Sequence, residues 1–229
     1  MVGIIVAMEV EIDLIKNRLE EKETKEINSI SFIKGKIGKT SVVCAVCGMG
    51  KVNAAICAQT MILVFKPDCI INTGVAGGLS DKLNICDIAV ADKLIEHDID
   101  ITPLGYPLGY IGGEDTVATY PDSELLKGLL EKARKISDIN VISGTIVSGD
   151  QFIHTKEKKE FLKSEFGAVA CEMEGAAIAH VCFANKVKFS VIRAISDGAK
   201  DDAPMDFNEF CKKAAKNSAN ILINYLLDK

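Results

Sequence analysis

The sequence has no tryptophan, three histidines and five prolines in 229 residues, and aromatic residues make up only 6% of the chain. Its 27 Lys and Arg residues against 32 Asp and Glu give a net charge of −5, and the basic residues do not cluster with aromatic ones. Proteins that bind nucleic acid need the opposite pattern. We therefore expect no nucleic acid as partner and favour a small ligand.

Long hydrophobic runs are absent too. The longest apolar stretch, Ala54–Phe65, is interrupted by two polar residues and is too short to span a bilayer. The apolar run Val2–Met8 has no basic residue before it and is followed by Glu9 and Glu11, so it lacks the pattern of an export signal. We expect no membrane partner and a cytoplasmic protein.

Eight cysteines lie mostly in apolar segments, as is typical of buried thiols in a reducing compartment. Cys44 and Cys47 form the only close pair, and no second pair or nearby histidine completes a zinc site. We therefore expect no metal.

Short β-rich runs alternate with helical patterns along the chain. The predicted strands are 2–8, 31–37, 40–47, 69–73, 86–91, 141–147, 168–171 and 188–195, and the predicted helices are 11–21, 52–65, 122–136, 156–165, 173–185 and 207–227. Such strands favour a sheet covered by helices on both faces. With 48% hydrophobic residues and no linker composition, residues 1–229 should form one α/β domain.

Ligands of such sheets bind beyond the carboxyl ends of the strands, so the residues that follow each strand are the candidates for a site. The informative ends are 7–11, 47–51, 72–78, 148–153 and 193–197. The long irregular segment 102–121 is also a candidate, because a loop of that length in a compact domain is usually functional.

Glycine-rich turns follow two of these strands, but neither matches a nucleotide motif. Gly48–Gly50 is followed by Asn53 where a dinucleotide fingerprint needs a third glycine, while Ala45 and Val52 break the phosphate-loop pattern. We therefore expect no cofactor. The turn 74–78 either lets backbone N–H groups approach a small ligand or serves tight packing, and both interpretations stay open.

Glu172 and Glu174 interrupt the apolar run 170–179. Since burying a carboxylate without a partner is costly, the pair indicates a ligand with polar groups. The alternative is that both are first-turn acids of the helix that begins near Met173.

Two further acids occupy strand ends. Asp197 is either a general acid in a dry site or the partner of Arg193 in an ion pair. Glu11 is either a base that activates water or an acid complementing a helix dipole. Together with the glutamate pair, they would protonate a leaving group, hold a sugar and activate water.

In combination, these motifs resemble the nucleoside phosphorylase superfamily, and specifically its bacterial 5'-methylthioadenosine/S-adenosylhomocysteine nucleosidases. The resemblance spans essentially the whole chain and rests on segments 3–11, 48–52, 71–79, 147–150, 172–174 and 193–197. It implies a three-layer α/β/α fold with a central mixed, twisted sheet. It also implies hydrolysis of the N-glycosidic bond of an adenine thionucleoside through an oxocarbenium-like transition state.

The resemblance assigns catalytic roles to three residues. Glu11 would activate the attacking water, Asp197 would protonate N7 of adenine, and Arg193 would help to position the water. Glu174 would bind the ribose hydroxyls, with Glu172 as a supporting carboxylate.

The resemblance also implies the remaining substrate contacts. Phe152 would stack on adenine, the Ile153 backbone would read its Watson–Crick edge, and Gly77 would lie at the sugar and water end. Ser196 would lie beside the acid. The 5'-thioalkyl pocket and sugar would be contacted by Met8, Met49, Met173 and Phe207, although methionine is also ordinary core material.

By the same resemblance, Ile101, Leu104 and Tyr106 would enter the neighbouring subunit's pocket in a homodimer. Val75 stands where a Ser near the acid Asp197 is frequent, which bears on the tuning of that acid. Leu104 replaces a frequent Phe, and segment 112–114 differs from the usual loop. The preference among methylthioadenosine, S-adenosylhomocysteine, 5'-deoxyadenosine and aminodeoxyfutalosine therefore stays open.

Two other functions compete. A phosphorylase would need arginines around the glycine turn, whereas segment 73–79 contains no basic residue, which favours water as nucleophile. A non-catalytic nucleoside sensor is disfavoured because Glu11 and Asp197 are both present.

Overall fold

The computed structural model describes residues 1–198 and 207–229, apart from the side chains of 207–209. Within these residues, nine strands form one mixed sheet in the order β2-β3-β4-β1-β5-β8-β7-β6-β9. The strands are β1 (Val2–Val6), β2 (Glu20–Ile27), β3 (Ile30–Ile37), β4 (Thr40–Val46), β5 (Cys69–Gly78), β6 (Ile88–Glu96), β7 (Val141–Ser148), β8 (Ala168–Glu172) and β9 (Lys188–Asp197).

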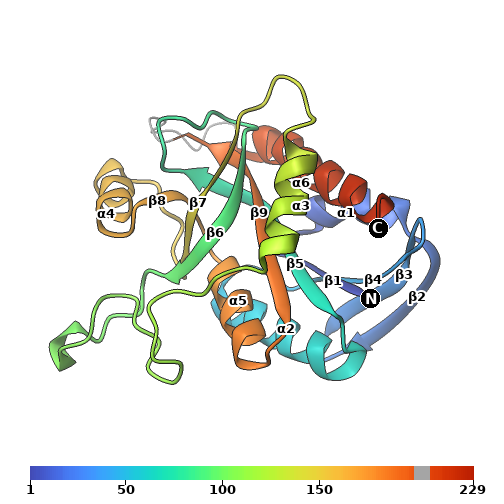
Figure 1. Ribbon diagram of the computed structural model, residues 1–229, viewed down its shortest axis with the longest axis horizontal. Helices are drawn as coiled ribbons and strands as arrows, with labels where there is room; N and C mark the ends of the chain where they lie inside the picture. The colour runs from blue at the N-terminus through green and yellow to red at the C-terminus, as the bar shows by residue number, and fades with distance from the viewer. Residues whose placement is uncertain (199–206) are drawn as a thin grey trace.

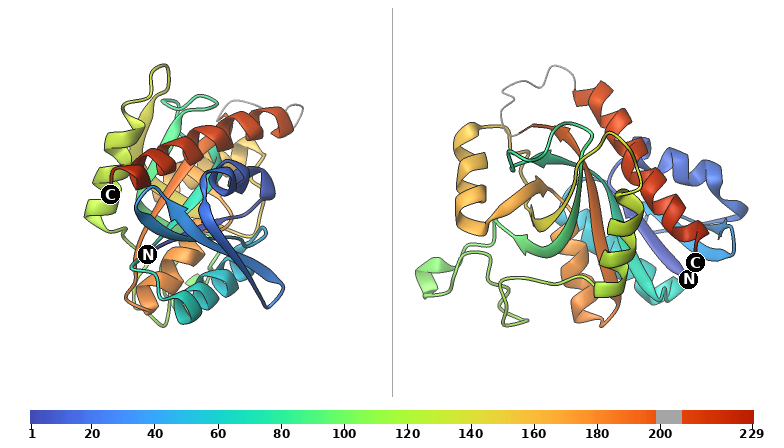
Figure 2. Two further views of the ribbon diagram at one scale, coloured as in Figure 1. Left: turned by 90° about the vertical axis from the view of Figure 1, so that its right-hand side faces the viewer. Right: turned by 45° about the horizontal axis from the view of Figure 1, so that its top comes forward.

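Helices cover both faces of this sheet, as Figures 1 and 2 show. The helices are α1 (Glu9–Arg18), α2 (Lys51–Phe65), α3 (Ser123–Ala133), α4 (Lys156–Phe166), α5 (Gly175–Ala184) and α6 (Phe207–Leu227), with a short 3-10 helix, η1 (Thr102–Leu104). One core cluster joins α1, α3 and α6 to the sheet, and a second joins α2 and α5 to its other face. The layered α/β/α prediction is thereby confirmed.

The strands β5, β8, β7, β6 and β9 close into a ring, because β9 pairs with both β6 and β5. β5 and β9 run parallel over nearly their whole length, from the pair Cys69–Lys188 to the pair Gly77–Asp197. This register brings the glycine turn at the end of β5 beside the acid at the end of β9.

Among the differences between predicted and observed elements, four concern β2, β5, β6 and α5. The strand β2 was not predicted, because its sequence EEKETKEI is charged and seven of its eight residues are exposed. β5 and β6 extend five residues beyond their predicted ends at Thr73 and Ala91. α5 begins at Gly175 rather than at Met173, so Glu172 and Glu174 precede the helix.

The described residues also bear on the membrane and metal predictions. No helix among them is long and apolar enough to cross a bilayer. They contain no group of three or more His, Cys, Asp or Glu residues placed to hold a metal ion. All eight cysteines are buried and unpaired.

Candidate active site

One cavity collects residues from the ends of β1, β5, β7, β8 and β9, as the strand-end argument predicts. It is lined by Ala7, Met8, Glu11, Met49, Val75, Ala76, Gly77, Gln151, Phe152, Ile153, Cys171, Glu172, Met173, Glu174, Arg193, Ser196 and Asp197. Segments from distant parts of the chain thus bring four acidic residues to one cavity.

Glu11 lies in the first turn of α1 and is almost fully buried. Its Oε2 accepts hydrogen bonds from the backbone N–H groups of Ala7 and Met8, both at 2.9 Å, and its Oε1 accepts one from Val75 at 2.9 Å. Burial raises the pKa of Glu11, while Arg193 and these N–H donors oppose the rise. A fixed carboxyl group that accepts a proton more readily than usual is suited to act as a base.

Glu172 ends β8, and its carboxyl group accepts hydrogen bonds from several protein donors. It accepts hydrogen bonds from the backbone N–H groups of Glu174 and Gly175, at 2.9 and 2.8 Å, and so caps the start of α5. The hydroxyl of Ser148 and the guanidinium of Arg193 also donate to it. Glu172 ends β8 and lies before α5, so it is not an acid of the first helical turn as the alternative interpretation expected, and its oxygens are occupied by the protein itself.

Glu174 has fewer protein partners than Glu172. Its Oε1 accepts from the backbone N–H of Gly50 at 2.9 Å, and its Oε2 lies 3.5 Å from Nη2 of Arg193. Burial and the neighbouring Glu172 raise the pKa of Glu174 to about 7. Of the two glutamates, Glu174 is the one with acceptor capacity left for a ligand.

Arg193 is fully buried in β9 and binds the glutamates rather than the nearby aspartate. Its Nη2 donates to Glu172 and, at 2.5 Å, to Oδ1 of Asn72, whose amide donates in turn to the Ile5 carbonyl. The predicted alternative of an Asp197–Arg193 ion pair is therefore wrong. Arg193 therefore offsets part of the charge of the buried glutamates that it contacts.

Asp197 ends β9 with its side chain about one-fifth exposed. Its Oδ1 accepts from the hydroxyl of Ser196 at 3.0 Å, and its Oδ2 lies 3.6 Å from Nζ of Lys159. A Cβ at Gly77 would lie 3.1 Å from Oδ2. The glycine therefore leaves the carboxyl group open to the cavity, as a close approach to a ligand requires.

The segment after β7 supplies an aromatic face. Phe152 is 55% exposed beside the cavity, whereas Ile153 is buried in a small cluster with Leu79 and Cys171. Met8, Met49 and Met173 line the cavity, and Met49 is 63% exposed. An open aromatic ring next to an acid can hold a flat heterocycle.

Four predicted residues are not placed in this cavity. Ile101, Leu104 and Tyr106 lie on the loop after β6, which extends away from the body of the protein in Figure 1. Leu104 is 74% exposed and Tyr106 stacks on Tyr110. Phe207 opens α6, but its side chain lies outside the described part of the structure.

Sequence reasoning missed the buried Lys159, and it assigned no role to the buried Asn72 and Ser148, although both lie in the candidate strand ends. Asn72, in the interior of β5, and Ser148, at the end of β7, hydrogen-bond Arg193 and Glu172 respectively. Lys159 could have been found from spacing, because it shares the buried face of α4 with Leu162 and Phe166.

The fold and cavity define an α/β protein of the kind that binds nucleosides at strand ends. The chain belongs to the phosphorylase superfamily, whose family model matches residues 1–227. A 5'-methylthioadenosine/S-adenosylhomocysteine nucleosidase of Staphylococcus carnosus is 41% identical, with 99% of each chain covered.

Solved structures agree with this relationship. The nucleosidase of that name from Neisseria meningitidis, in complex with methylthio-immucillin-A, has a TM-score of 0.95 and 36% identity, and covers 100% of this chain and 99% of its own. A futalosine hydrolase of Helicobacter pylori has a TM-score of 0.92 and 37% identity, with 99% and 97% covered.

Proposed function

We propose that this chain hydrolyses the N-glycosidic bond of 5'-methylthioadenosine and S-adenosylhomocysteine, and also of 5'-deoxyadenosine, to adenine and the 5-substituted ribose. This activity would serve methionine salvage. The observation that carries the proposal is the meeting of Glu11, Glu174 and Asp197 in one cavity. The relatives that bear the nucleosidase name support the substrate class.

Glu11 is the base in this proposal. Its carboxyl group is held by three backbone N–H donors, so a water beside it meets an acceptor of fixed orientation. The burial that raises its pKa also increases its affinity for the proton of that water.

Asp197 is the acid, and the purine lies against it. Gly77 leaves room at its Oδ2, and the hydroxyl of Ser196 fixes the orientation of the carboxyl group. Phe152 stacks on adenine and the backbone of Ile153 reads the adenine edge. Proton transfer from Asp197 to N7 then lets the purine leave as a neutral molecule.

Glu174 holds the ribose hydroxyls, with Met173 packed against the sugar. Met8, Met49 and Phe207 contact the 5'-substituent. Arg193 acts through the carboxylates it binds, since its Nη2 contacts Glu172, Glu174 and Asn72. Its contribution to placing the water is therefore indirect, by holding the charged groups around it.

Water is the proposed nucleophile. The turn 73–79 has no basic side chain. The nearby Arg193 forms ion pairs with two glutamates. A phosphate would lack its usual cationic partners there.

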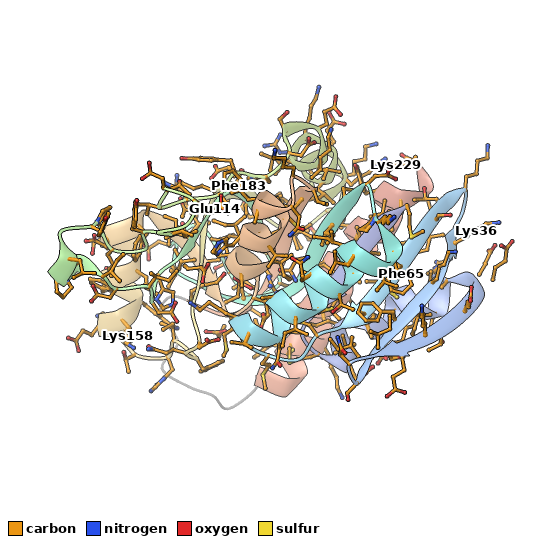
Figure 3. All side chains as sticks on the ribbon, turned by 90° about the horizontal axis from the view of Figure 1, so that it is seen from below. Lys36, Phe65, Glu114, Lys158, Phe183 and Lys229 are labelled. Carbon is orange, nitrogen blue, oxygen red and sulfur yellow. The ribbon has the colours of Figure 1, made fainter. Side chains whose placement is uncertain are left out.

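The active form is proposed to be a homodimer. Leu104 and Tyr106 are exposed on a loop that does not reach its own cavity. Helix α2 exposes Val52, Ile56 and Leu63, and Figure 3 shows this helix across the underside of the molecule, with Phe65 near its end. Apolar side chains in that number are usually covered by a partner. The eight unpaired cysteines support the cytoplasm as its compartment.

The test is a measurement of kcat/KM for methylthioadenosine, S-adenosylhomocysteine, 5'-deoxyadenosine and aminodeoxyfutalosine, with and without phosphate. We expect adenine release from the first three at rates that phosphate does not change, together with free sugar as product. A sugar 1-phosphate would show a phosphorylase instead. The absence of adenine release would contradict the proposal.

A further inference from the structure

Lys159 differs from its neighbours on α4. Lys156 and Lys158 are exposed, whereas the Lys159 side chain is only 5% exposed. It shares the buried face of the helix with Leu162 and Phe166. An ammonium group taken out of water needs compensating partners, so its position must be explained.

The ammonium group of Lys159 contacts Asp197 and the residue that follows it, Gly198. Nζ donates to the carbonyl of Gly198 at 2.7 Å and lies 3.6 Å from Oδ2 of Asp197. The other carboxyl oxygen of Asp197 accepts from Ser196 at 3.0 Å. One carboxyl oxygen of the acid thus accepts a hydrogen bond from a hydroxyl, and the other forms an ion pair with a cation.

Lys159 also connects the acid with the purine-facing segment. Phe152 and Ile153 directly precede α4, whose first turn is capped by Thr155. A change in the position of α4 would therefore move the aromatic face and the ammonium group together.

We propose that Lys159 is a positioning residue for proton donation by Asp197, an inference that rests on the proposed function. As the C–N bond breaks, its electron pair goes to the purine, and the proton moves from the Asp197 carboxyl group to N7. The negative charge left on Asp197 forms next to the ammonium group of Lys159. This attraction is stronger in the transition state than with bound substrate, so it raises kcat rather than affinity.

The proposal predicts a dependence on the leaving group. Lys159→Gln removes the charge and keeps a donor for the Gly198 carbonyl, Lys159→Met removes both, and Lys159→Arg keeps the charge. Each is assayed with methylthioadenosine and with the 4-nitrophenyl 5-methylthioriboside, whose phenolate leaves without a proton. Lys163→Met is the matched control, because Lys163 lies on the same helix and pairs with Asp81 at the surface.

With methylthioadenosine, we expect kcat of the Gln and Met variants to fall at least ~10-fold with KM within about twofold. With the aryl riboside, their kcat should stay within about threefold, and Lys159→Arg should recover most activity on both substrates. The control should match the wild-type chain.

Equal losses on both substrates would overturn the inference, because they would show that Lys159 only supports the fold of α4. Unchanged kcat on methylthioadenosine would overturn it as well. If Lys159→Met does not fold, the Gln variant decides alone. A wild-type chain that releases no adenine would instead overturn the proposed function, and this inference with it.

Discussion

A single methyl group at Gly74 should disable the proposed base. A Cβ at this position would lie 2.6 Å from Nη1 of Arg193 and still closer to Oε1 of Glu11. Atoms do not pack at such distances, so Oε1 must retreat by roughly 1 Å. Its hydrogen bond with the Val75 N–H, now 2.9 Å long, would then exceed the normal range.

The expected loss follows from that bond. A hydrogen bond to a charged group contributes roughly 1.5–3 kcal/mol, and a displacement of about 1 Å at a reacting group costs about as much again in alignment. Gly74→Ala should therefore lower kcat by roughly 10²- to 10⁴-fold, measured as adenine release at saturating methylthioadenosine.

Gly113→Ala is the control, because a Cβ at Gly113 meets nothing within 4 Å. It should match the wild-type chain in kcat and in thermal unfolding. A Gly74→Ala variant with kcat within threefold of wild type would refute the geometric reasoning for Glu11.

The remaining predictions concern the other groups. Glu11→Gln and Asp197→Asn should each lower turnover by at least ~10², and near-normal activity in either would remove that residue from its role. Glu174→Ala should raise KM for ribosides; unchanged binding would contradict its sugar contact. Burial and Glu172 raise the pKa of Glu174 from 4.5 to about 7. As pH rises, Glu174 therefore loses its proton in the unfolded chain before it does in the folded one. The free energy of unfolding should fall as pH rises from 4.5 to about 7. Glu174→Gln should flatten this part of the stability curve in denaturant titrations. Tyr106→Asp should abolish dimers and activity together, and mixing it with Asp197→Asn should restore some turnover; a fully active monomer by light scattering would exclude the shared pocket.

The positions of the site residues could be predicted because they follow strands. Apolar runs such as Val2–Val6 and Lys188–Asp197 are legible in sequence, and the ends of parallel strands meet on one side of a sheet. The missed strand β2 has no apolar face, since it lies at the outer end of the sheet order in contact with solvent. Whether residues 1–229 fold as one independent domain stays a prediction.

The pairing of charges within the site was harder to predict. Residues 193 and 197 share a strand, and at about 3.3 Å per residue they lie about 13 Å apart, which rules out direct pairing. The partners of Arg193 are Glu172, at the end of β8, and Glu174, just after it. They are distant from Arg193 in sequence, so local spacing could not reveal the pairing. Lys159 was missed because its neighbours are also lysines, and only the helical period of Leu162 and Phe166 distinguishes it.

The outer strand β2 has a consequence for the behaviour of the protein in concentrated solution. An unpaired strand edge is a template on which another chain can add a strand and start aggregation. Five strands avoid this by closing into a ring, while β2 is rich in Glu and Lys side chains that are almost all exposed. A second copy that paired with this edge would have to desolvate those charges. Association through β2 should therefore be unfavourable even at high protein concentration.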